Sequence, residues 1–220
     1  MKTRMLGTFA LALALALSAN PVQAQVTVGP MAGVSIYTFT GSDANIYGED
    51  LGANFSKTSR VGFLVGGFAE FEFGTVFAIE PQLLWVQKGG KYDIDLTDGS
   101  GSGSLTFKLD YIQVPVLFKA EYRKAGQDFA PSLFAGPAVA FKTSCKLDVE
   151  AGSASVSDDC PADGVNSLGW SLIFGLGIEF ERLVLQARYD LGLSNVSQGS
   201  AEDFKNGGWG ITLGYGFPIR

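Results

Sequence analysis

Apolar and polar positions alternate with a period of two along the last fifty residues of the chain. From Leu168 to Phe180 every second residue is apolar, and the residues between are mostly glycine, serine or glutamate. The same alternation continues through 183–196 and 208–217. This period is typical of β-strands with one apolar face. Apart from Ile173 and Val184, the other face is too polar for a hydrophobic core, which favours a transmembrane barrel with apolar side chains toward lipid.

The whole pattern predicts eight strands separated by connections of alternating length. The predicted strands are 26–39, 60–73, 76–88, 105–122, 131–142, 168–180, 183–196 and 208–217. Short connections fall at 74–75, 123–130 and 181–182, and longer, mostly polar ones at 40–59, 89–104, 143–167 and 197–207. Short turns at one end and long loops at the other are typical of outer-membrane barrels. We therefore predict an all-β fold, an eight-stranded antiparallel up-and-down transmembrane β-barrel.

The N-terminus predicts export. Lys2 and Arg4 precede an apolar run at 6–17, and small residues at 22–24 offer a cleavage site. We expect a signal peptide at 1–24 and the barrel domain at 25–220. The alternative, a single membrane anchor, needs about 20 apolar residues, more than this run contains. Cleavage would move the net charge from −6 to −8, because the segment contains two basic residues and no acidic one, and an acidic chain disfavours nucleic acid as a partner.

Aromatic residues on the apolar faces predict two girdles, one at each membrane interface. Trp85, Trp170 and Trp209 lie at the predicted strand ends next to long loops. The girdle at the short-turn end comprises Phe71, Phe77, Tyr122, Phe180 and Phe217. Membrane lipids are therefore expected partners of the barrel surface.

One strand carries a family resemblance. The segment 109–119, with Tyr111, Pro115 and Lys119 in the spacing Tyr-x-x-x-Pro-x-x-x-Lys, resembles the corresponding strand of PorT-like outer-membrane β-barrel proteins. Segments 131–137, 175–177 and 187–192 are similar to later strands of that family. The resemblance spans nearly all of the chain after residue 24 and implies a structural family, with no particular activity. It departs at the end, where three residues follow Phe217, so Phe217 as a terminal assembly signal stays open.

Charged and amide side chains on the inward positions form the candidate site. They are Glu70, Glu80, Gln82, Lys119, Glu121, Glu179, Arg188 and Asp190. One interpretation is a proton relay or ion site. The other, which we favour, is a plug of paired charges, since eight strands leave room for little beyond side chains and buried charges need partners. Glu80, on the strand next to that of Lys119, is a candidate partner for this lysine.

Other chemistry finds little support in the residues. The chain has no histidine, so a Ser-His-acid arrangement is impossible and no enzymatic activity or cofactor is predicted. Asp93, Asp95 and Asp98 depart from the spacing of an EF-hand calcium loop. The acidic residues of 148–163 could bind cations or a partner, but solvated surface charge is the better interpretation. Cys145 and Cys160 are expected to form a disulfide, the default in an exported chain.

Taken together, these patterns predict a protein of the Gram-negative cell outer membrane. We expect a structural or interaction role through long extracellular loops that meet other envelope proteins or extracellular ligands. One alternative is a narrow porin or small-solute channel. Another is a soluble periplasmic lipid-binding barrel, which would place the apolar faces inside.

Overall fold

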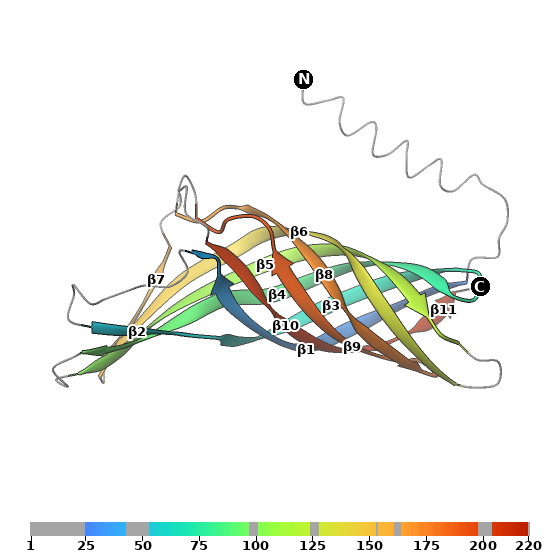
Figure 1. The fold of residues 1–220 in the computed structure, drawn as a ribbon, viewed down its shortest axis with the longest axis horizontal. Coiled ribbons are helices and arrows are strands. Elements are labelled where there is room, and N and C mark those ends of the chain that lie inside the picture. Colours follow the sequence, from blue (N-terminus) through green and yellow to red (C-terminus); the bar gives the residue numbers. More distant parts are fainter. Residues whose placement is uncertain are drawn as a thin grey trace, which may run out of the picture.

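The strands form one closed antiparallel barrel. The computed structural model describes residues 25–42, 53–96, 101–123, 128–152, 154–160, 164–197 and 204–219. The strands are β1 (Val26–Thr40), β2 (Ala53–Thr58), β3 (Arg60–Phe73), β4 (Phe77–Leu96), β5 (Ser102–Glu121), β6 (Phe129–Ala151), β7 (Ala154–Asp159), β8 (Leu168–Phe180), β9 (Leu183–Gly192), β10 (Lys205–Tyr215) and β11 (Phe217–Ile219). Eight of them form the ring, in the order β1-β3-β4-β5-β6-β8-β9-β10, and β10 closes on β1 (Figure 1). The predicted up-and-down barrel is confirmed.

The first and last strands close the barrel. β1 pairs with β3 on one side and with β10 on the other, where Met31 lies opposite Gly214 and Thr40 opposite Lys205. The short β11 continues this pairing, with Val28 opposite Phe217. Closure removes both free edges from the membrane-spanning part, which satisfies the backbone groups that lipid cannot hydrogen-bond.

The two faces of each strand divide as the alternation predicts. Large apolar side chains point outward, as Leu176 does with 59% of its surface exposed, while Ile173 and Val184 point inward and are buried. Glycines on the inward positions let the strands approach closely: a Cβ on Gly33 would lie 1.9 Å from the carbonyl oxygen of Ile211 on β10. The apolar surface therefore faces lipid and the lumen is narrow.

The described residues include no helix that is long and apolar enough to cross a membrane.

Several strands continue well beyond their predicted ends. The segments 89–104 and 143–167 were expected as loops, but β4 runs to Leu96, β5 begins at Ser102, and β6 runs to Ala151 before β7 turns back along it. β2 likewise occupies part of the predicted loop 40–59. Trp85 consequently lies inside β4 and not at its end. The predicted strand ends were wrong here because they were placed where the alternation of apolar and polar residues stops. Strands that continue beyond the bilayer need no apolar face toward lipid, so they lack this alternation.

These continuations form what we call the outer sheet, in the order β2-β4-β5-β6-β7. Residues 53–58 of β2 pair with 91–96 of β4, and residues 154–159 of β7 pair with 146–151 of β6. The outer sheet extends from the end of the barrel opposite the C-terminus (Figure 1). It is open, because β2 and β7 each pair with one strand only among the described residues.

Candidate functional site

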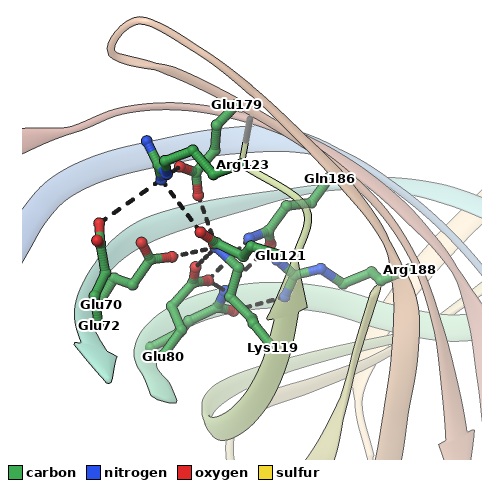
Figure 2. A network of polar contacts seen from close by, with 10 residues as sticks. Glu70, Glu72, Glu80, Lys119, Glu121, Arg123, Glu179, Gln186 and Arg188 are labelled. Carbon is green, nitrogen blue, oxygen red and sulfur yellow. Dashed lines mark hydrogen bonds and ion pairs between the residues drawn. The ribbon is translucent and has the colours of Figure 1, made fainter. Parts of the chain in front are cut away.

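A cluster of carboxylates surrounds Lys119 inside the barrel, and we call it the Lys119 cage. The Lys119 ammonium lies 3.0 Å from Glu80, 3.0 Å from Glu121 and 2.8 Å from Glu179, and it also pairs with Glu70. The lysine side chain is completely buried, and its partners come from β3, β4, β5 and β8 (Figure 2). A buried cation of this kind requires compensating charges, and here four carboxylates supply them.

A second cation joins the cage near the short-turn end of the barrel. The Arg123 guanidinium contacts Glu179 at 3.0 Å, Glu121 at 3.2 Å and Glu72 at 3.7 Å. Beside it lies a hollow of about 320 Å³, lined by Phe68, Glu70, Glu179 and Arg182 among others. The cage is thus approached by an open, largely acidic vestibule on this side.

Amide side chains connect the cage to the middle of the lumen. The Gln186 amide donates a hydrogen bond to Glu80 at 2.9 Å. The Arg188 guanidinium donates to the side-chain oxygens of Gln82 at 2.7 Å and Gln186 at 2.6 Å. Gln82 also donates to Glu80, so Glu80, Gln82, Gln186 and Arg188 form one connected network. Figure 2 shows Glu80, Gln186 and Arg188 of this network.

A second buried ion pair lies farther toward the outer end. Lys88 pairs with Asp190 at 2.7 Å. The same Asp190 oxygen accepts hydrogen bonds from the Tyr37 hydroxyl and the Gln113 amide, each at 2.8 Å. Tyr37, Lys88 and Gln113 were not among the predicted site residues. Lys88 could have been predicted, because it lies an even number of positions from Glu80 and Gln82 on the same strand and so points inward as they do. Tyr37 gives no such signal, because aromatic residues are common in strands.

The lumen also contains apolar layers that the predicted charge plug did not include. Above the Lys88–Asp190 pair, Phe39 packs against Phe204 with ring centroids 4.4 Å apart and against Phe107 at 5.5 Å. Together with Tyr92, Leu109, Tyr111, Ala140, Val165 and Val196, these rings form the cap cluster. A separate group of Leu117, Phe134, Ala138 and Ile173 packs lower down. Both polar and apolar side chains therefore fill the interior.

The outer sheet has one apolar and one polar face. The apolar face continues from the cap cluster through Leu105, Leu147, Val149 and Val156. On the polar face, Lys91 pairs with Asp93 at 2.9 Å, and Lys108 pairs with Asp148. Hydrogen bonds from Lys91 and Lys108 lower the pKa of Asp93 and of Asp148, respectively. The side chains of these pairs are partly exposed to water, unlike those of the lumen.

Cys145 and Cys160 are joined by a disulfide at the base of the β6–β7 hairpin. Their Cα atoms are 5.4 Å apart, and 15 positions separate them in the chain. The Cys160 amide also donates a hydrogen bond to the Cys145 carbonyl at 3.1 Å. The bond therefore joins β6 to the residue that directly follows β7 and does not cross the barrel.

The eight predicted lumen residues all lie on inward positions and all take part in the two charged networks. The predicted girdle residues are less uniform. Phe77, Tyr122, Trp170, Phe180, Trp209 and Phe217 are exposed on the outside of the barrel, whereas Phe71 and Trp85 are half-buried. The aromatic girdles stay a prediction, because a girdle is defined by the position of its residues relative to the two interfaces of the bilayer.

The fold and its faces define a class: a closed β-barrel with a lipid-facing apolar surface, a filled lumen and a polar sheet beyond one end. The chain belongs to the family described as outer membrane protein beta-barrel domain, whose model matches residues 19–198. It is a protein of the outer membrane. A comparison with curated proteins finds no match.

Solved structures of small outer-membrane barrels are similar to this chain. Ail of Yersinia pestis, solved in complex with the heparin analogue sucrose octasulfate, is 15% identical, with 88% of this chain and 99% of that one covered and a TM-score of 0.39. OprG of Pseudomonas aeruginosa is 12% identical, with 90% and 96% covered and a TM-score of 0.46. Neisserial surface protein A is 11% identical, with 86% and 97% covered and a TM-score of 0.41.

Proposed function

We propose that this protein is a non-conducting outer-membrane barrel that holds the outer sheet at the cell surface as an interaction surface. The observation that carries the proposal is the filled lumen. Lys119 and its carboxylates, the Arg188 amide network, the Lys88–Asp190 pair and the cap cluster follow one another along the barrel. The outer sheet is the part of the protein that extends beyond the barrel at the cell surface.

Two further properties belong to the same proposal. Export would depend on the segment 1–24 as a cleaved signal peptide, which lies outside the described residues. Membership of the PorT-like branch is supported by Tyr111, Pro115 and Lys119, of which Tyr111 and Lys119 point into the lumen and are buried.

A non-enzymatic role fits the chemistry of the site. The carboxylates of the cage are engaged by Lys119 and Arg123, and the chain has no histidine that could act as a general base near neutral pH. We propose no cofactor, because the polar side chains of the two charged networks in the interior bind one another. The partners we propose are membrane lipids along the barrel and envelope proteins or extracellular ligands at the outer sheet.

The two alternative functions fit the geometry less well. A channel would need a continuous aqueous path, and the cap cluster and the lower apolar group obstruct it. A soluble lipid carrier would need an apolar interior, whereas here apolar side chains such as Leu176 face outward and charges face inward.

The proposal is tested by one measurement on purified, refolded protein and by one in intact cells. Planar-bilayer recordings should show no steady single-channel conductance, and steady conductance would move the assignment to the channel. In intact cells, wild-type protein should capture surface partners that a variant with shortened β4–β5 and β6–β7 hairpins does not. Equal capture by both proteins would exclude the outer sheet as the interaction surface.

A further inference from the structure

The outer sheet ends in a free edge at β7. On one side β7 pairs with β6, and on the other it meets no strand among the described residues. All six residues of β7 are exposed. A free edge presents unpaired backbone donors and acceptors to which another chain can add a strand. We propose that the β7 edge binds an extended, cationic segment of a partner polypeptide as an additional strand. This inference rests on the proposed function.

The hydrogen-bond register shows which backbone groups of β7 are available. The bond from the Cys160 amide to the Cys145 carbonyl marks that pair as hydrogen-bonded. In an antiparallel ladder such pairs alternate with pairs that do not bond to each other. The backbone groups of Ala154, Val156 and Asp158 therefore point toward β6. The groups directed to the free edge belong to Ser155, Ser157 and Asp159.

The β7 edge is held in strand conformation at both ends. The hairpin turns at Gly152, whose φ of 60° lies in the left-handed region that favours glycine. The disulfide between Cys145 and Cys160 closes the other end. A strand that is ordered before binding loses less conformational entropy when a partner adds to it. The other free edge, β2, has no such covalent closure, so β7 is the better prepared of the two.

The charge around β7 indicates the chemistry of the partner. The paired segments of β6 and β7 contain four carboxylates, at Asp148, Glu150, Asp158 and Asp159, and one lysine, Lys146. Lys108 of β5 engages Asp148. Asp158 and Asp159 form no ion pair with any described residue, so this edge carries an excess of negative charge that favours a basic partner.

An apolar contact is available beside these carboxylates. Val156 is 61% exposed, and Val149, its neighbour across the ladder, is 42% exposed. An apolar side chain of a partner strand on this face would contact Val156 and extend the apolar strip that Val156 forms with Val149, because side chains on one face of adjacent strands contact each other. The expected segment therefore alternates basic and apolar residues.

The test uses the full-length protein refolded in neutral lipid vesicles and a fluorescent peptide of alternating lysine and valine. Fluorescence anisotropy should show binding that weakens with salt, and a glutamate–valine peptide should not bind. On binding, the amides of Ser155, Ser157 and Asp159 should gain protection from hydrogen exchange. Protection at β2 instead, or no protection on β7, would overturn the inference.

Variants at the free edge separate strand addition from simple charge attraction. Ser155→Pro removes an edge-facing amide without removing a bond to β6, and proline is tolerated at such positions. It should weaken peptide binding by about tenfold, the equivalent of about 1.4 kcal/mol. Ser155→Ala keeps the amide and should bind as wild type. Asp158→Asn with Asp159→Asn should lower the affinity and reduce its salt dependence.

The outcomes distinguish this inference from the proposed function. If Ser155→Pro and Ser155→Ala bind the peptide equally well, strand addition at β7 is wrong. Loss of surface partners on shortening the hairpins would then still support the outer sheet as an interaction surface through other groups. Unchanged gel mobility of the folded barrel in each variant shows that the fold is intact.

Discussion

The Lys119 cage and the outer sheet both contain lysine–carboxylate ion pairs, but the pairs of the cage are buried and those of the outer sheet are partly exposed to water. In the cage, a completely buried lysine meets carboxylates at 2.8–3.0 Å. In the outer sheet, Lys91 meets Asp93 at 2.9 Å, but these side chains are 35% and 39% exposed. Distance therefore does not separate the two regions. Solvent does, because water screens the outer pair and compensates either partner when the other is removed, whereas the lumen cannot.

The comparison predicts a large effect for removing the buried cation. Lys119→Met should destabilise the barrel by about 3–5 kcal/mol, because Glu70, Glu80, Glu121 and Glu179 lose their shared partner. The midpoint of urea unfolding in vesicles, followed by tryptophan fluorescence, measures this.

Two further variants sharpen this first prediction. Adding Glu80→Gln to Lys119→Met should recover part of the loss, since one uncompensated charge is removed. Lys91→Met, which removes the cation of the exposed Lys91–Asp93 pair, is the matched control and should change the midpoint little. Equal effects of Lys119→Met and Lys91→Met would contradict the contrast between the two regions.

A somewhat smaller effect is expected from a charge on the lipid-facing surface. Leu176→Arg should cost about 2–4 kcal/mol if this position lies near the bilayer midplane. Val156→Arg, an equally exposed apolar position in the outer sheet, should be nearly neutral for the barrel. As an independent check, Leu176→Cys should resist a water-soluble thiol reagent in intact membranes. Ready labelling there would show that the outward face is not in lipid.

The disulfide should matter locally and not globally. Closing the 15-residue separation is worth about 3 kcal/mol by the chain-entropy model, and here it acts on the β6–β7 hairpin. Replacing both cysteines by serine should speed hydrogen exchange in β7 while the barrel's unfolding midpoint stays the same. Loss of barrel assembly would show that the bond has a larger role. Mass spectrometry of unreduced peptides checks that wild type contains the bond.

The smallest effect concerns pH at the outer sheet. Because the hydrogen bond from Lys108 lowers the pKa of Asp148, this pair stabilises the pairing of β5 with β6 in the outer sheet above the ordinary aspartate pKa of about 3.9. The stabilisation is lost as the pH falls through the lowered pKa of the folded state. Lys108→Ala should return the Asp148 pKa toward its usual value, at a cost of about 0–1 kcal/mol. An NMR titration of the Asp148 carboxyl carbon measures the shift, and an unchanged pKa in the variant would contradict the pairing.

Strand parity explains how much of the site was predictable. The inward placement of Glu80, Gln82 and Lys119 follows from alternation alone, because a one-residue shift would put the apolar set into the lumen and the charges into lipid. If the rule that every second residue points inward had been continued beyond residue 88, it would also have placed Tyr92 on the inner side of its strand. It was not applied there, because polar residues on both faces outside the bilayer resemble a loop.

The sequence by itself determined the strand number in the ring, the lipid-facing side of each strand and the residues that enter the lumen. These follow from the period-two pattern, because lipid surrounds the barrel and requires an apolar side chain at every outward position. The tertiary structure decided which inward residues meet. Lys119 reaches Glu70 of β3 and Glu179 of β8, and Lys88 of β4 reaches Asp190 of β9, across the lumen. Such contacts depend on the register and tilt with which the ring closes, which alternation along one strand does not encode.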